Sequence, residues 1–157
     1  RFVAKPAVSA SSYRTKLINL NEEGLNSLLA QYSEASDFLI QPFLPEIGAS
    51  GEVSMIFFND EFSHAVQKRP APGEFRVQAE HGVHEVPMNP GLDIVEAGHR
   101  ILKASGFETL YVRVDGIIRE DRFTLMELEL IEPDLFLTQH EKAIDRFADA
   151  ITNRLRV

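Results

Sequence analysis

The residues whose types and spacing best suit chemistry are three carboxylates, Asp115, Glu127 and Glu129. Asp115 lies in the apolar segment 111–118 and the two glutamates lie in 123–131. These segments predict two antiparallel strands joined in a hairpin centred on Asp121. Because side chains alternate between the faces of a strand, this hairpin places Asp115 opposite Glu127 and gathers all three acids on one face. Opposed like charges destabilise a sheet, so the pattern calls for a cation nearby.

Two interpretations of this acidic face stay open. The set offers only oxygen ligands, and the chain has no cysteine, so the ion it suits is a hard cation such as Mg²⁺. The other interpretation is a solvated acidic face, on which Arg113 simply pairs with Glu129, the residue opposite it.

A second group of candidate residues is basic and scattered along the chain. Lys5 ends an apolar segment at the start, Lys68 closes a segment in the middle, and Arg76 follows the turn residue Gly73. Cations at separate strand ends can converge on phosphate groups. Taken singly, each is also compatible with an ordinary surface charge.

The elements that must position these residues follow from hydrophobic periodicity. The predicted helices cover 21–32, 92–104 and 138–155, and the predicted strands cover 2–5, 17–20, 38–41, 52–58, 62–68, 75–78, 111–118 and 123–131. Hairpins in the middle and near the end indicate an α+β fold in two lobes, not alternating βα units.

Composition narrows the class of protein. The formal net charge is −8 and no stretch is basic, which argues against a nucleic-acid partner. No run reaches the about 18 consecutive apolar residues of a membrane span, and no signal peptide is recognisable, so we expect a cytoplasmic protein without a membrane partner. The chain opens without methionine, almost directly in an apolar run, so we also expect that further residues precede Arg1.

Three motifs in order carry a resemblance to a known family. They are Phe43-Leu44-Pro45-Glu46, the segment 68–76 with the sequence KRPAPGEFR, and Asp115 followed by Glu127 and Glu129. From Val3 to about Phe136 the chain resembles the ATP-grasp superfamily, nearest to prokaryotic glutathione synthetase and the ribosomal-protein glutamate ligases. Each motif alone is weak, whereas the ordered set is fairly specific.

The resemblance implies a fold of two α+β lobes whose antiparallel sheets grip a nucleotide between them. Residues 1–70 would form the small lobe with hinge and hairpin, and residues 71–157 the large lobe with the carboxylates and C-terminal helix. A preceding substrate lobe would be absent from this chain.

The resemblance also implies a role for each candidate residue. Lys5 and Lys68 would bind the phosphates of ATP, Arg76 would stabilise an acyl phosphate and the tetrahedral intermediate, and residues 9–13 would form the phosphate-covering loop. The remaining residues would meet adenine (Gln41, Phe43, Leu44), the ribose (Glu46) and Mg²⁺, with Mn²⁺ as the alternative ion (Asp115, Glu127, Glu129).

The activity so implied is ATP-dependent, ADP-forming ligation of a small-molecule carboxylate to an amine, such as an amino acid or peptide, through an acyl phosphate. A homo-oligomer is compatible with it. Three features favour an alternative, a non-catalytic nucleotide-binding module: residues 9–12 lack glycine, Val83 follows Gly82 in place of a second glycine, and the expected substrate lobe is absent. Glu129 stands where the family commonly has asparagine, and its added negative charge would alter the strength or number of bound metal ions. A kinase-like or carboxylase enzyme on the same scaffold is a further alternative, and this fragment alone can be inactive.

Overall fold

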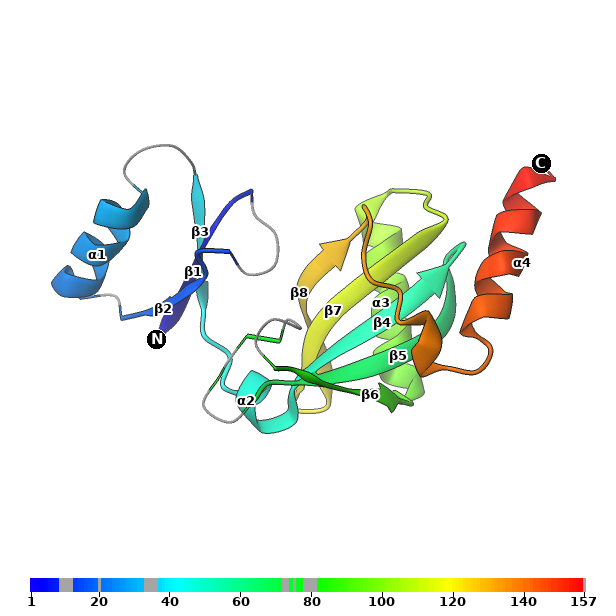
Figure 1. The fold of residues 1–157 in the computed structure, drawn as a ribbon, viewed down its shortest axis with the longest axis horizontal. Coiled ribbons are helices and arrows are strands. Elements are labelled where there is room, and N and C mark those ends of the chain that lie inside the picture. The colour runs from blue at the N-terminus through cyan, green and yellow to red at the C-terminus, as the bar shows by residue number, and fades with distance from the viewer. Residues whose placement is uncertain are drawn as a thin grey trace.

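The computed structural model describes residues 1–8, 13–19, 21–32, 37–71, 74, 76–77 and 82–156. It contains a three-stranded sheet with the order β2-β1-β3 and a five-stranded sheet with the order β6-β5-β4-β7-β8 (Figure 1). All neighbouring strands run antiparallel. The predicted α+β class with two antiparallel sheets is therefore confirmed.

The first sheet packs against one helix. Its strands are β1 (Phe2–Pro6), β2 (Lys16–Ile18) and β3 (Phe38–Pro42), and the helix is α1 (Glu22–Tyr32). The side chain of Asn21 accepts a hydrogen bond from the Gly24 amide at 2.9 Å, which caps the helix. Ala4 and Leu28 form the buried contact between sheet and helix.

The second sheet is built around a fully buried central strand. Its strands are β4 (Glu52–Phe58), β5 (Glu61–Arg69), β6 (His84–Met88), β7 (Tyr111–Arg119) and β8 (Arg122–Glu129). Every residue of β4 is buried, so this strand needs a neighbour on each edge and cover on each face. The predicted small lobe, residues 1–70, includes the β4–β5 hairpin. In the structure this hairpin belongs to the larger sheet, so the chain passes from one sheet to the other earlier, between β3 and β4.

Two segments were missing from the expected elements. The short helix α2 (Glu46–Ser50) joins the two sheets, and β6 forms an edge of the larger one. Strand β6 contains Pro87, which weakens a sequence-based strand assignment but is tolerated at a sheet edge. Of the predicted strand 75–78, residues 75 and 78 lie outside the described residues, and Arg76 and Val77 are not part of a strand.

The two faces of the larger sheet have different cover. Helix α3 (Leu92–Ser105) lies on one face, where Ile94 and Leu102 join the core formed by Val53, Met55, Phe57, Val112 and Val114. Helix α4 (Ala143–Leu155) and the segment 133–139 cover part of the other face, through Ala150 and Phe136. The uncovered part of that second face carries the charged residues described below.

Helix α4 begins five residues later than the predicted start at residue 138. A 3₁₀ turn, Leu137–Gln139, precedes it. The preceding residues run over the sheet, where His64 Nε2 lies 3.0 Å from the Leu135 carbonyl oxygen and Arg113 donates to the Asp134 carbonyl oxygen. These side-chain contacts hold the segment before the helix against the sheet.

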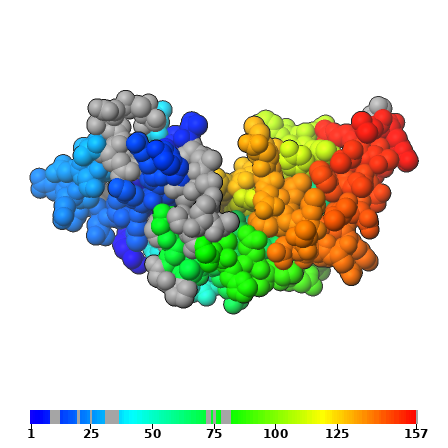
Figure 2. All heavy atoms as spheres, viewed as in Figure 1, coloured from blue at the N-terminus to red at the C-terminus, as the bar shows by residue number. Residues whose placement is uncertain are grey.

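The two sheets follow one another along the longest axis of the molecule, and α4 lies at the end remote from the first sheet (Figure 1). Figure 2 shows the outline hollowed between the blue N-terminal residues and the yellow and orange residues at and after the last strand of the larger sheet. A nucleotide gripped between two lobes needs such a gap. Among the described helices, none combines the length and the apolar character that a membrane crossing requires.

Candidate functional site

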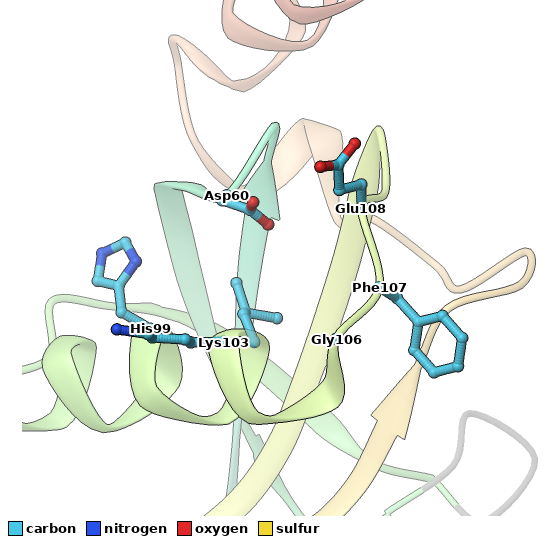
Figure 3. A pocket seen from close by; sticks show the side chains of 7 residues that line it. Asp60, His99, Lys103, Gly106, Phe107 and Glu108 are labelled. Atoms are coloured by element: carbon cyan, nitrogen blue, oxygen red, sulfur yellow. The ribbon is translucent and has the colours of Figure 1, made fainter.

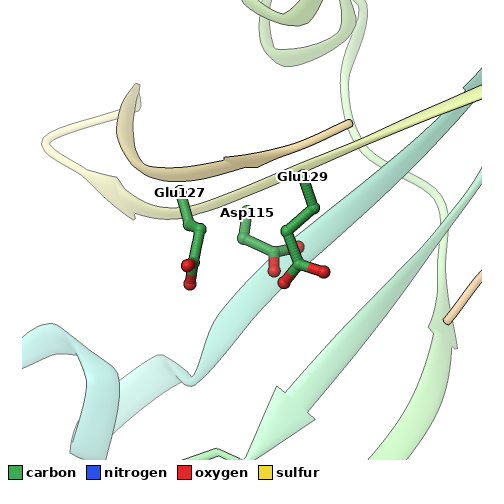
Figure 4. A group of neighbouring side chains, drawn as sticks. All are labelled: Asp115, Glu127 and Glu129. Atoms are coloured by element: carbon green, nitrogen blue, oxygen red, sulfur yellow. The ribbon is translucent and has the colours of Figure 1, made fainter. Parts of the chain in front are cut away.

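The three carboxylates lie together on the β7–β8 hairpin. Arg113 pairs with Glu129 and Asp115 pairs with Glu127, which is the predicted register. One oxygen of Asp115, Glu127 and Glu129 lies within 4.8 Å of the oxygens of the other two. All three side chains point to the same side of the hairpin (Figure 4). The cluster that the sequence predicted is therefore present.

A β-bulge is what brings these acids together. The turn contains two residues, Glu120 and Asp121, both with positive φ, so it is not centred on Asp121. Continued from this turn, an unbroken ladder would set Asp115 opposite Met126 and send Glu127 to the other face. The register instead shifts at Asp115, which leaves Met126 as the extra residue.

Glycine is required beside the bulge. A Cβ atom on Gly116 would lie 2.3 Å from the Thr124 carbonyl oxygen and 2.5 Å from the ring of Phe123. Both separations are far below van der Waals contact, and one involves backbone, which cannot rotate away. Gly116 therefore permits the close approach of the two strands at this position.

Asp115 is held by two cations. It is only 2% exposed; its Oδ2 lies 2.9 Å from Arg113 Nη2 and 3.4 Å from Lys68 Nζ. Arg113 also pairs with Glu129 and donates to the Asp134 carbonyl oxygen at 3.2 Å. Burial raises the pKa of the Glu129 carboxyl group, and Arg113 opposes this shift. The Arg113–Glu129 ion pair that the interpretation as a solvated acidic face predicts is therefore present, but its side chains are largely buried.

Glu52 is a fourth carboxylate at this site, and the sequence analysis missed it. It pairs with Lys68, directly opposite on β5, and both side chains are buried. Burial raises the pKa of Glu52 to about 7, while Lys68 lowers it. Burial alone would lower the pKa of Lys68, but Glu52 and Asp115 together raise it. The sequence does contain a signal for this residue, because Glu52 and Ser54 are polar residues at alternate positions of an otherwise apolar strand.

The donor set suits a divalent cation. Four carboxyl groups, those of Glu52, Asp115, Glu127 and Glu129, share this face with two cations, Lys68 and Arg113. Glu127 is exposed and makes no ion pair with another described residue. An oxygen-only cluster with an excess of negative charge is the kind of site that Mg²⁺ prefers.

Lys5 and Gln41 lie on the other sheet. Val3 pairs with Gln41 and Lys5 pairs with Leu39, so all four share one face. Ala4 points the opposite way, toward α1, which lies on the side of this sheet remote from the five-stranded sheet (Figure 1). Lys5 and Gln41 therefore face the gap between the sheets.

The predicted hinge connects the two sheets. The Phe43 amide donates to the Arg1 carbonyl oxygen at 3.1 Å, and the Arg1 guanidinium lies 4.7 Å from the centre of the Phe43 ring. Leu44 follows, and Glu46 begins α2. One oxygen of Glu46 accepts a hydrogen bond from Arg119 Nε at 3.1 Å, and the other is buried with no hydrogen-bond partner in the described part of the chain.

Arg76 pairs with a neighbour in its own loop. Its Nη2 lies 2.6 Å from Glu74 Oε2, and its Nε lies 3.0 Å from Glu74 Oε1. This hydrogen bonding raises the pKa of the Arg76 guanidinium. Residues 9–12, which form most of the expected phosphate loop, lie outside the described residues, as do Gly73 and His81.

A separate hollow lies on the α3 side of the larger sheet, away from these residues. Its volume is about 300 Å³, and it lies beside the β4–β5 turn (Figure 3). It is lined by Asp60, His99, Leu102, Lys103, Gly106, Phe107 and Glu108. No predicted site residue contributes to it.

No protein-family model matches the chain. It is 28% identical over 177 residues to the cycloserine biosynthesis protein DcsG of Streptomyces lavendulae, which covers 99% of this chain and 55% of the relative. The crystal structure of D-cycloserine synthetase DcsG matches with a TM-score of 0.83 and 26% identity, covering 98% of this chain and 55% of that one. The chain thus spans about half the length of the relatives it matches.

Two further groups of solved structures share the fold. A D-alanine–D-alanine ligase from Bacillus anthracis matches with a TM-score of 0.72 and 18% identity, over 97% of this chain and 53% of that one. The ATP-grasp ligase PsnB, in complex with a precursor variant, Mg and ADP, matches with a TM-score of 0.64 and 15% identity, over 96% and 46%. The ATP-grasp fold that the sequence resemblance predicted is therefore confirmed. The predicted nearest branch, glutathione synthetase and the glutamate ligases, is not specifically supported by these matches.

Proposed function

From this ATP-grasp fold, we propose that the chain is the nucleotide-binding and catalytic part of an ATP-dependent carboxylate–amine ligase. The observation that carries the proposal is the cluster of Asp115, Glu127 and Glu129 beside the buried ammonium group of Lys68. Matched solved structures include ligases described as complexes with ATP and with Mg and ADP, which supports the same cofactors here.

ATP would lie in the gap between the two sheets. Lys68 would contact the phosphates from the larger sheet and Lys5 from the smaller one, where it faces the gap. The connection through Phe43 and Leu44 would meet the adenine through its backbone. Glu46 would reach the ribose hydroxyl groups, and its second carboxyl oxygen, which is buried without a partner in the described residues, is the atom suited to this contact.

The three clustered carboxylates would hold Mg²⁺. Bound there, the ion would neutralise negative charge on the phosphates as a carboxylate attacks the γ-phosphorus. Ion binding requires Asp115 and Glu129 to share their oxygens with Arg113 or release it, since Arg113 contacts both. Arg113 and Lys68 therefore keep the acidic cluster stable until the cation arrives.

Arg76 would act on the substrate side. The amine would attack the carbonyl carbon of the acyl phosphate, negative charge would develop on the carbonyl oxygen, and inorganic phosphate would then leave. A preorganised donor at that oxygen contributes about 3–4 kcal/mol to catalysis. Glu74 holds the Arg76 guanidinium through two side-chain hydrogen bonds and thereby fixes its orientation.

A non-catalytic nucleotide-binding module is the second candidate. It is favoured by the ion pairs of Lys68 and Arg113, which satisfy part of the acidic cluster without any cation. Such a module would bind ADP and Mg²⁺ but would not release phosphate when a carboxylate and an amine are added.

Titration calorimetry with ATP and Mg²⁺, followed by measurement of ADP release with candidate amino acids, tests both candidates. Glu127→Gln should remove the Mg²⁺ dependence, because it deletes a ligand charge while leaving the ion pairs of Asp115 intact. Glu120→Gln, at the exposed hairpin tip, is the matched control and should behave as the wild type. Unchanged Mg²⁺-dependent binding in Glu127→Gln would refute the metal assignment. Because this fragment alone can be inactive, the turnover measurement uses the whole protein that contains this chain, and binding without turnover there would select the non-catalytic module.

A further inference from the structure

A serine hydroxyl group at the centre of the larger sheet is buried without a hydrogen-bond partner. Ser54 is 0% exposed, and its Oγ atom bonds to none of the residues that the structure describes. A buried hydroxyl group in this state has lost its hydrogen bonds to water and gained none in return, so such groups are rare in folded proteins. The position of Ser54 therefore needs a reason other than the stability of the chain.

The hydroxyl group lies on the face that carries the acidic cluster. Ser54 follows Glu52 by two residues in β4, so both side chains project from the same face of the strand. Ser54 is paired with Val66 of β5 on one side and with Asp115 of β7 on the other. Directly opposed side chains of neighbouring strands have Cβ atoms about 5 Å apart. Of the two cross-strand partners, only Asp115 has a side chain that can accept a hydrogen bond.

Asp115 is oriented by its two cations. Its Oδ1 accepts a hydrogen bond from Arg113 Nε at 3.1 Å, and its Oδ2 lies 2.9 Å from Arg113 Nη2. The ammonium group of Lys68 lies 3.4 Å from the same Oδ2. A carboxylate has about four acceptor positions, so a hydrogen bond from the neighbouring Ser54 needs only a rotation of this group.

A divalent cation at the acidic cluster would require such a rotation. Glu127 and Glu129 lie on the β8 side of Asp115, whereas Ser54 lies on its β4 side. When Asp115 presents one oxygen to a cation on the β8 side, its other oxygen faces Ser54. Carboxylates that hold metals are themselves hydrogen-bonded, and loss of such a bond typically lowers metal affinity by about 10- to 100-fold.

We propose that Ser54 is a positioning residue for the metal site: its hydroxyl group donates a hydrogen bond to Asp115 when this carboxylate binds a divalent cation. The bond holds Asp115 in its liganding orientation while Arg113 and Lys68 share or release it. The buried hydroxyl group thereby gains its acceptor in the cation-bound state. The inference rests on the proposed function, because it requires a cation at the acidic cluster.

Ser54→Ala separates this role from a purely structural one. Mn²⁺ is titrated into the chain in the presence of ADP, and electron paramagnetic resonance measures the protein-bound Mn²⁺, with Mn²⁺ and ADP alone as the baseline. Ser54→Ala should raise the Kd for Mn²⁺ about tenfold, because Asp115 loses its donor. The midpoint of urea denaturation without metal should stay the same or rise, since the variant removes a hydroxyl group that is unpaired among the described residues.

Ser63→Ala is the matched control. It removes another buried hydroxyl group, but this one does have a partner, His64 Nδ1 at 2.9 Å. Ser63→Ala should therefore lower the urea midpoint and leave the Kd for Mn²⁺ at the wild-type value.

Two results would overturn the inference. One is an equal Kd for Mn²⁺ in Ser54→Ala and the wild type. The other is weaker Mn²⁺ binding in Ser54→Ala accompanied by a lower urea midpoint, which is what a structural role predicts. Absence of protein-bound Mn²⁺ in the wild type would instead refute the metal site of the proposed function, so the two failures are distinct.

Discussion

Glu52 makes the stability of this chain depend on pH in a way that a single substitution should remove. Its carboxyl group is 7% exposed, and burial raises its pKa from 4.5 to about 7. A folded-state pKa above the unfolded value means that the fold prefers the protonated form. The resulting stabilisation is present at low pH and is lost as the pH rises through about 7.

The size of the effect follows from these two pKa values. Between about pH 5 and about pH 8, Glu52 should lower the free energy of unfolding by about 2–3 kcal/mol. Glu52→Gln cannot ionise, and its amide oxygen still accepts from Lys68, so this fall should disappear. His64 and Glu129 also have shifted pKa values: burial lowers that of His64 and raises that of Glu129. Their contributions to the pH dependence are present in both proteins and cancel in the comparison.

Urea denaturation of both proteins at the two pH values gives the change in the free energy of unfolding with pH for each protein. The difference between these two changes is the contribution of Glu52. The exposed Glu61 offers a matched control, because Glu61→Gln should retain the wild-type pH dependence. An identical pH dependence in wild type and Glu52→Gln would refute the reasoning. It would mean that Lys68 keeps Glu52 ionised in the folded chain throughout this range.

Two further substitutions test the bulge and the substrate side. Gly116→Ala should lower the free energy of unfolding by about 3 kcal/mol, since its Cβ overlaps the Thr124 carbonyl group. Gly48→Ala is the control: its Cβ has open space in helix α2, where alanine is favoured over glycine, so the free energy of unfolding should stay the same or rise by up to about 1 kcal/mol in the same denaturation assay. Equal stability of the two variants would contradict the close approach of the strands. Arg76→Ala should lower kcat by about 100-fold while ATP affinity stays near the wild-type value; equal losses of both would move Arg76 to plain nucleotide binding.

Much of the fold was accessible from the sequence because its long elements have strong periodicity. Strand β4 and the start of α3 were predicted at the observed residues, and Asn21 was identified as the cap of α1. The sequence predicted the acidic face correctly but placed the turn of the β7–β8 hairpin incorrectly. The turn is displaced by half a residue from the assumed centre, and the extra residue Met126 restores the register at Asp115.

The rest depended on contacts between distant segments. The Glu52–Lys68 pair joins two strands whose sequences only show isolated polar residues among apolar ones. Strand β6 exists because β5 offers it a free edge, and its own five residues include a proline. The segment 133–139 lies over the sheet through contacts with Arg113 and His64, which no local pattern specifies.

The extra residue in β8 also separates the hairpin into two independently variable parts. The tip, with its left-handed Glu120-Asp121 pair, sets the handedness and length of the connection, while Met126 alone decides to which side Glu127 and Glu129 project. New tip sequences, such as a grafted epitope or a reporter peptide, should therefore leave the acids in place. Deletion of Met126 should have the opposite result: an intact hairpin whose two glutamates have exchanged sides with their neighbours.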